Sequence, residues 1–199
     1  MKEQIVARLR RLTPGTPFMA KDFLDIASRG SIDVTLADLA REGKIRRLRR
    51  GLYDVPRVNP ELGGELSPNI DETARALARR FRWKIVPEGA WAANLLGLST
   101  QVPAKIVYLS DGPNKKVPLG RRVIQFKHVR PQNYATAEGK PALAIQALRY
   151  LGVKRVDKDI CLRLRQALSD AERRQLLKAT RHGVDWIYKV AKEIAQESS

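Results

Sequence analysis

Four arginines crowd a short stretch around Gly51, and their chemistry suits a phosphate backbone. Two strand-like runs, residues 44–48 and 52–55, flank this glycine and predict a basic β-hairpin. Arginine stays charged, forms bidentate hydrogen bonds with phosphate oxygens and fits a narrow minor groove. The hairpin therefore predicts a DNA contact, and a solvated basic hairpin of a protein-binding module is the alternative. The candidate contacts are Arg46, Arg47, Arg49 and Arg50. Strand neighbours alternate in direction, which favours the last three and leaves the first open.

A helix directly precedes this hairpin, and its exposed face carries few cations. Apolar residues at helical spacing predict a buried stripe from Ile32 to Ala40, and Gly43 is suited to end the helix. Asp33 and Asp38 face outward, where their charges would repel phosphates. Asp33 either accepts from a cytosine amino group or favours the helix N-terminus. DNA affinity is therefore expected to rest on phosphate contacts and to fall with salt.

The segment before this helix predicts the rest of a helix-turn-helix. A first helix is expected up to Leu12 and a short second helix over Phe18–Ser28, followed by a turn at Arg29–Ser31. In this turn Arg29 is placed to reach a base or the DNA backbone. Ser31 is a candidate helix cap or phosphate contact. Together with the hairpin, this order of elements is typical of a winged helix-turn-helix.

Residues suited to catalysis or metal binding are few. His128 and His182 lie far apart in the sequence, and Cys161 is the one cysteine, in a helical run that favours a buried packing thiol. Asp157 and Asp159 are flanked by cations, and helix initiation explains them better than a metal pair does. No glycine-rich phosphate-binding loop is present. We therefore expect no catalytic residue, no metal and no cofactor.

The whole chain is strongly basic. Its 199 residues include 38 lysines and arginines against 21 acidic residues, a formal net charge of +17. Such an excess on a chain with an ordinary 43% of hydrophobic residues suggests a polyanionic partner, most often nucleic acid. No apolar run approaches the roughly 18 residues that span a bilayer, and the first residues lack a signal-peptide pattern. We expect a cytoplasmic protein without a membrane partner.

The remaining sequence predicts a second domain. Residues 58–68 contain two prolines and two glycines and are expected to link a winged helix-turn-helix domain, residues 1–57, to a domain of residues 69–199. The fold class is α+β, in which a mixed α/β domain with a small, mostly antiparallel sheet and a helical C-terminus follows the winged helix. The expected elements are helices over residues 69–82, 90–96, 142–151, 158–167, from Ser169 and 183–195, and strands over residues 83–86, 104–109, 115–119 and 121–128.

Three stretches carry a resemblance to a known family. They are EGKIRRLRRGLYDVP, Glu42–Pro56; IVPEGAWAANLLGLSTQVPAKIVYLSDGP, Ile85–Pro113; and RRVIQFKHVRP, Arg121–Pro131. With them the chain resembles, over nearly its whole length, the AbiEi family of bacterial type IV antitoxins, in the branch with an N-terminal winged helix. The winged stretch is weakly specific, because many regulators end a wing in a similar triplet. The later stretches are more specific.

The resemblance implies an autorepressor that binds double-stranded DNA at repeats in its own promoter. It also implies that the C-terminal domain counters a co-encoded nucleotidyltransferase-like toxin without forming a stable complex. By motif, the DNA-binding positions would be Arg29, Ser31 and Thr35 together with the wing arginines, although helical phase places Thr35 at the border of the buried face. Basic residues of the second domain would also help to hold DNA.

Two other functions stay open from the sequence. The second domain is larger than a repressor requires, which allows a nuclease-like enzyme that processes nucleic acid and is delivered by the winged domain. It also allows a transcriptional regulator whose second domain binds a small molecule.

Overall fold

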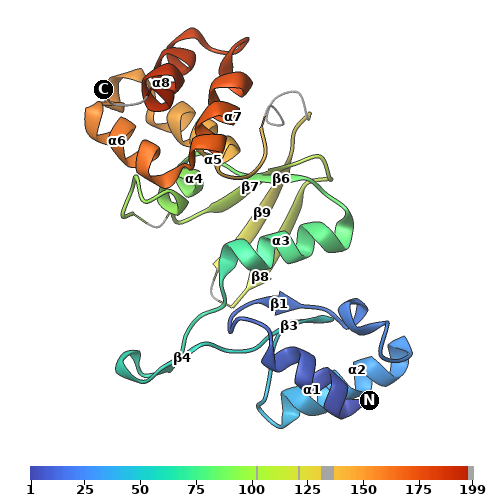
Figure 1. Ribbon diagram of the computed structural model, residues 1–199. Coiled ribbons are helices and arrows are strands. Elements are labelled where there is room, and N and C mark those ends of the chain that lie inside the picture. Colours follow the sequence, from blue (N-terminus) through green and yellow to red (C-terminus); the bar gives the residue numbers. More distant parts are fainter. Residues whose placement is uncertain (102, 121, 131–136, 197–199) are drawn as a thin grey trace. The chain divides into compact units, whose positions relative to one another are not determined.

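The computed structural model describes residues 1–101, 103–120, 122–130 and 137–196. The fold is α+β, as expected, and the C-terminal part is helical (Figure 1). The chain divides into two compact units, which we call the N-terminal and C-terminal units. The N-terminal unit is Met1–Arg82 with Pro118–Arg122, and the C-terminal unit is Trp83–Val117 with Val123–Ser199.

The N-terminal unit begins with the helices and strands of a winged helix-turn-helix. They are α1 (Lys2–Arg10), β1 (Pro17–Phe18), the 3-10 helix η1 (Ala20–Phe23), α2 (Arg29–Arg41), β2 (Arg46–Arg49) and β3 (Leu52–Asp54). The strands form an antiparallel sheet in the order β1-β3-β2, and we call the β2–β3 hairpin the wing. Apolar side chains from the helices and the wing share one core, which includes Ile5, Leu9, Phe23, Ile32, Leu36, Leu39, Ile45 and Tyr53.

The second helix expected over residues 18–28 is wrong. Pro17 and Phe18 are extended and pair with β3, so the chain enters this segment as a strand. A tight 3-10 turn follows, in which the Asp22 carboxylate accepts the backbone N–H of Met19 at 2.8 Å. Pairing with a strand over thirty residues away overrides the local helical spacing here, because tertiary context routinely outweighs propensity.

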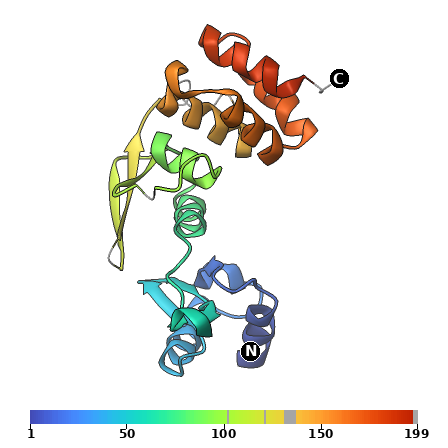
Figure 2. The same cartoon turned by 90° about the vertical axis from the view of Figure 1, so that its left-hand side faces the viewer.

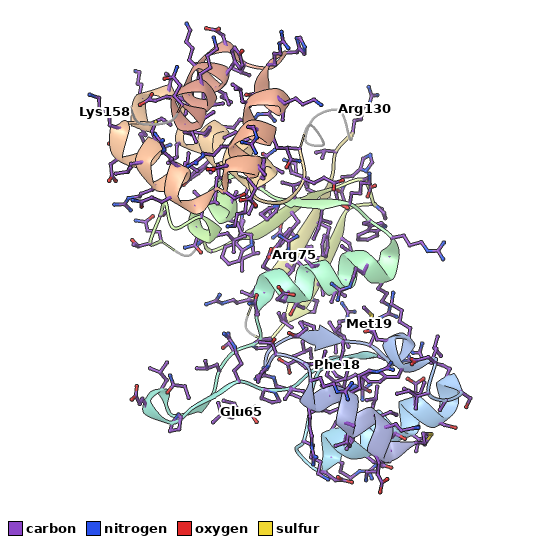
Figure 3. All side chains as sticks on the ribbon, viewed as in Figure 1. Phe18, Met19, Glu65, Arg75, Arg130 and Lys158 are labelled. Atoms are coloured by element: carbon purple, nitrogen blue, oxygen red, sulfur yellow. The ribbon has the colours of Figure 1, made fainter. Side chains whose placement is uncertain are left out.

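Aromatic packing explains why this short strand forms. The Phe18 ring stacks on Tyr53 of β3 with 6.1 Å between ring centroids, and it meets Phe23 edge-on at 5.7 Å. All three side chains are buried. Figure 3 labels Phe18 at the sheet of the N-terminal unit. The three rings therefore fix the root of the wing to the 3-10 turn before α2.

The segment expected as a linker, residues 58–68, contains a small hairpin. It consists of β4 (Val58–Asn59), the 3-10 helix η2 (Pro60–Leu62) and β5 (Gly64–Glu65). We call Val58–Glu65 the arm, which projects from the winged helix in Figure 1 and points towards the viewer in Figure 2. Helix α3 (Ile70–Phe81) follows, where Asn69 accepts a backbone N–H of the first turn at 3.1 Å. The N-terminal unit thus extends to Arg82, whereas independent folding of residues 1–57 stays a prediction.

The C-terminal unit packs helices against a four-stranded sheet of order β6-β7-β9-β8. Strand β6 is antiparallel to β7, whereas β9 is parallel to β7. The elements are β6 (Ile85–Pro87), α4 (Gly89–Leu95), β7 (Ile106–Ser110), β8 (Lys115–Leu119), β9 (Arg122–His128), α5 (Gly139–Leu151), the 3-10 helix η4 (Val153–Arg155), α6 (Lys158–Ala167), α7 (Asp170–Thr180) and α8 (Asp185–Ala195).

Helix α5 is the centre of the C-terminal core. Eight consecutive residues, Pro141–Leu148, are buried on all sides of this helix, because α4, α7 and α8 pack around it. The helix start expected at Ser169 is confirmed, and a capping box forms there with the Ser169 backbone N–H donating to Glu172 at 2.8 Å. Cys161 is buried in this core, and burial raises the pKa of its thiol to about 11, which suits a packing role.

The three tryptophans of the chain all lie in the C-terminal unit. Trp91 is buried and its indole N–H donates to the Tyr108 hydroxyl at 2.7 Å. Trp83 packs directly on Gly112, where the Cβ atom of any larger residue would overlap the indole ring. Trp186 is partly buried against the helical core. These three residues therefore serve packing in the C-terminal unit.

Candidate nucleic-acid interface

Three wing arginines present guanidinium groups that meet no acceptor among the described residues. Two of them are exposed and one is half-buried. A guanidinium carries five N–H donors in a planar fork that matches phosphate oxygens. The three side chains therefore form a set of unused donors along one hairpin. They are Arg47, Arg49 and Arg50.

The wing backbone explains how these arginines are presented. Gly51 turns the hairpin with φ +74°, a conformation that favours glycine. Arg47 lies opposite Tyr53, but Arg49 lies opposite Leu52, so the register shifts between the two arginines. Such a bulge breaks the strict alternation of side chains. Buried Leu52 and Tyr53 hold the opposite strand in the core.

Arg46, one of the expected contacts, has a guanidinium that is bound within the protein. Its Nε donates to Asp54 Oδ1 at 3.0 Å, and its Nη2 donates to Asp54 Oδ2 at 2.7 Å. Asp54 is fully buried, and Arg46 Nη1 also donates to the Leu66 carbonyl at 2.8 Å. Breaking a bidentate ion pair with a buried carboxylate costs several kcal/mol, about 3 to 5. Arg46 therefore holds the wing in place, and a contact between Arg46 and DNA stays a prediction.

Helix α2 begins three residues earlier than the sequence predicts. Ser28 caps it by accepting the Ser31 backbone N–H at 3.4 Å, so Arg29–Ser31 is the first helical turn and not a connecting turn. Arg29 is exposed but pairs with Asp33 one turn later, with 2.9 Å between Nε and Oδ2. The Ser31 hydroxyl is exposed and lies 3.0 Å from that of Ser28. Both candidates remain at the surface at the start of α2.

Thr35, another expected contact, is buried. Its side chain is only 5% exposed, and its hydroxyl donates to the Ser31 carbonyl at 2.9 Å within the helix. This position leaves little of the side chain for an external contact, and the DNA contact of Thr35 stays a prediction. The outer face of α2 instead presents Val34, which is 62% exposed, and Asp38, which pairs with Arg41 at 2.9 Å. As expected, this face offers few unpaired cations.

Arg80 at the end of α3 is a candidate that sequence reasoning missed. Its Nη1 lies 3.5 Å from the Arg50 carbonyl, and the same atom is close to Gly51 at the tip of the wing. Arg79 precedes it, and Arg82 ends the helix in the left-handed conformation. Helix α3 therefore places Arg80 beside the wing. The basic last turn of α3 was visible in the sequence, but its proximity to Gly51 was not.

The family of the chain follows from a comparison with family models. Residues 4–176 match the model of a family of unknown function, DUF6088. The chain belongs to DUF6088. The match runs from α1 into α7 and therefore includes the wing, the arm and the sheet of the C-terminal unit. No curated protein matches the chain.

The base of the winged helix in this DUF6088 chain carries a small ion cluster. Glu42 Oε1 accepts from Lys2 Nζ at 2.6 Å, and its Oε2 lies 2.7 Å from Lys44 Nζ. Hydrogen bonds from these two lysines lower the pKa of the Glu42 carboxyl from 4.5 to about 2. The cluster joins the start of α1 to the segment between α2 and the wing.

The described part of this DUF6088 chain contains neither a metal-binding cluster nor a helix suited to span a membrane. Within residues 1–101, 103–120, 122–130 and 137–196, no three histidine, cysteine or acidic side chains gather closely enough to hold a metal ion. In the same ranges, no helix combines the length and the apolar character needed to cross a membrane.

Proposed function

We propose that this DUF6088 protein binds double-stranded DNA through its wing. The observation that carries this proposal is the contrast within one hairpin. Arg46 is saturated by protein acceptors, whereas Arg47, Arg49 and Arg50 have none among the described residues. Arginines that serve only the fold are expected to find partners within it. The three that do not are free to bind an external anion of matching geometry.

The surroundings of the wing favour a phosphate-driven contact. Arg80 lies beside the wing tip, and the chain as a whole carries a net charge of +17. The outer face of α2 adds Arg29, which is already paired with Asp33. Affinity is therefore expected to come mainly from phosphates, and base reading from α2 to be modest. In this role the protein represses its own promoter by binding repeats there.

The direct test measures binding of the full chain to the DNA upstream of its own gene as a function of salt. Because each lost phosphate contact lowers the slope of log affinity against log salt by about one, the Arg47→Ala/Arg49→Ala variant should lower it by about two. Its affinity should fall at least about tenfold, or 1.4 kcal/mol. Fluorescence anisotropy with labelled duplex gives both quantities.

A matched control removes the same charge elsewhere. Arg163 and Lys189 are each paired with an aspartate of their own helix, at 2.8 Å in both cases. The Arg163→Ala/Lys189→Ala variant should bind DNA nearly as the parent does. Equal losses in the two double variants would show that net charge alone, and not the wing, controls binding.

The resemblance to AbiEi antitoxins supports a wider role as our proposal. In that role the C-terminal unit counters a nucleotidyltransferase-like toxin encoded beside this gene, without a stable complex. Co-expression of the full chain with the product of the neighbouring gene tests it. The protein should restore growth, and the wing double variant should do so too, since neutralisation would not require the promoter. A neighbouring product that is harmless when expressed alone would remove the basis for this role.

A ligand-responsive regulator is the second candidate, and two hollows of the C-terminal unit favour it. They measure about 400 and 450 Å³ and share Glu88 and Val107. Their polar lining includes Lys105, Gln146, Lys116, Gln125 and Lys127. Such linings suit a small anion. Thermal-shift screening with phosphorylated and carboxylated metabolites, followed by DNA release, would support this candidate. Absence of any shift would remove it.

A further inference from the structure

The arm differs in chemistry from the rest of this basic chain. Among the described residues, Leu62 and Val58 are the two most exposed large apolar side chains, at 72% and 65%. The arm contains Glu61 and Glu65 but no lysine or arginine. Figure 3 shows Glu65 on this projecting segment. Glu65 lies 3.5 Å from Arg46 Nη1, whereas Glu61 has no ion-pair partner among the described residues. The Glu61 carboxylate would be repelled by DNA phosphates, so the arm suits a partner that is apolar and basic.

The arm is held in one shape, which favours binding. Val58 pairs with Glu65 and Asn59 with Gly64, and the Asn59 side chain accepts the Glu61 backbone N–H at 2.9 Å. The left-handed Gly63 closes the turn. The base of the arm is tied to the wing by the Arg46–Leu66 hydrogen bond. A preformed arm loses less conformational entropy on docking than a mobile one.

An apolar groove with basic edges lies on the same unit. It measures about 300 Å³, about ten times the volume per molecule in liquid water, and so admits a branched side chain. Its apolar lining is Val6, Leu9, Leu39, Ile45 and Val55.

Charges at the edge of this groove are mainly positive. Arg10 and Lys44 line it, and Arg10 has no ion-pair partner among the described residues. Lys44 and Lys2 share Glu42, so the local balance stays positive despite that one carboxylate. The groove therefore complements an apolar segment with a negative charge.

We propose that the arm of one copy docks in this groove of a second copy, and that the exchange is reciprocal. Leu62 enters the apolar groove and Glu61 lies against Arg10. The negative arm and the positive edge of the groove are complementary in charge, whereas the chain as a whole is basic. Because the same two surfaces meet twice, the contact closes as a two-fold dimer instead of growing into a fibre.

The dimer would leave the wing free. None of the groove or arm residues belongs to the DNA-facing set of Arg47, Arg49 and Arg50. Two copies would then present two wings, which matches paired sites in DNA. The exchange does not depend on DNA binding, and its test needs no DNA. Two small arms place the contact at the weak end of protein interfaces, so association is expected in the micromolar range.

Sedimentation equilibrium of the full chain tests the proposal at up to about 100 µM, where a micromolar dimer is populated. The parent should sediment as a dimer at the upper end. Leu62→Glu should raise the dimer dissociation constant at least about tenfold, because a charge would enter an apolar groove. Val153→Glu is the matched control, since Val153 is also exposed and lies outside the arm.

A charge exchange keeps the test valid if one variant is unstable. Arg10→Glu and Glu61→Arg should each abolish the homodimer, because like charges then meet at both contacts. An equimolar mixture should restore a dimer, since every arm then meets a groove of opposite charge. Misfolded variants would not be rescued by mixing.

Other outcomes would overturn the exchange. These are a parent that stays monomeric throughout, a dimer that survives Leu62→Glu, and variants that mixing does not rescue. Open-ended oligomers would exclude the reciprocal geometry. A monomeric parent whose Leu62→Glu variant loses DNA affinity would assign the arm to DNA instead.

Discussion

The pair formed by Arg46 and Asp54 is the residue-level feature on which the wing depends. Both oxygens of a fully buried carboxylate receive hydrogen bonds from one guanidinium. The neighbouring Arg47 makes no such contact among the described residues. Two adjacent residues of one type therefore have separate roles, one in the fold and one at the surface. This division gives a direct stability prediction.

Arg46→Ala should destabilise the protein by about 3 kcal/mol, because it leaves a buried charge without a partner. Arg47→Ala should change the free energy of unfolding by less than about 0.5 kcal/mol, as is usual for exposed sites. Urea unfolding followed by circular dichroism measures both. The assignment fails if the two variants are equally stable. The order should reverse for DNA affinity. Folded Arg47→Ala protein should bind DNA more weakly than folded Arg46→Ala protein does.

The start of α2, which carries the candidate contacts Arg29 and Ser31, depends on its cap at the scale of elements. Ser28→Ala should destabilise the protein by about 1 kcal/mol, because it removes the side chain that caps the helix. Ser31→Ala should lower the free energy of unfolding by less than about 0.5 kcal/mol. The Ser31 hydroxyl is exposed, and its contact among the described residues is with the Ser28 hydroxyl. Thermal or urea unfolding of the two single variants measures both losses and shows which serine caps the helix. A larger loss for Ser31→Ala would move the cap back to the position that the sequence predicts.

The link between α1 and the end of α2 should depend on acidity. The pKa of Glu42 is lowered to about 2 in the folded chain from an ordinary 4.5, so its ionised form favours folding. That contribution is present above pH 4.5 and is lost as the pH falls towards 2. Glu42→Gln should therefore lower the melting temperature at pH 7, and the difference from the parent should shrink across that window. A difference that is constant with pH would exclude the ion cluster as its cause.

Much of the fold could be predicted where local signals suffice. The helix start at Ser169, the strand over residues 115–119 and the helix over residues 158–167 are confirmed. The segment after Pro17 was wrong because its conformation is set by pairing with β3, which no local pattern reveals.

The sequence predicted the basic hairpin of the candidate site but not the contacts of its individual arginines. The basic hairpin is present, but its pairing register places Arg46 opposite Asp54, and a bulge then breaks the alternation. Neither the register nor the bulge follows from residue types. Arg80 was missed because the chain brings α3 back to the wing tip thirty residues after Arg50. Single-residue roles therefore required tertiary contacts.

The excess charge acts on the whole molecule in two opposite ways. With 38 basic against 21 acidic residues, self-repulsion opposes the folded state at low salt. Exposed ion pairs weaken with salt, but each contributes at most about 1 kcal/mol, so the net excess should dominate.

The melting temperature should accordingly rise as sodium chloride increases from about 10 to 150 mM, over which the Debye length falls from about 30 to 8 Å. DNA affinity should fall over the same range. Differential scanning calorimetry and anisotropy on one preparation compare the two. A melting temperature that falls with salt would show that ion pairs outweigh the net repulsion.

The location of the tryptophans makes one half of the molecule separately visible in fluorescence. All three lie in the C-terminal unit, and Trp83 and Trp91 are held by Gly112 and Tyr108. Their emission is therefore an intrinsic label for that unit, whereas the wing contributes none. Spectra recorded with and without DNA would reveal any participation of the C-terminal unit in binding, without an added dye. The C-terminal unit can thus be followed separately from the wing.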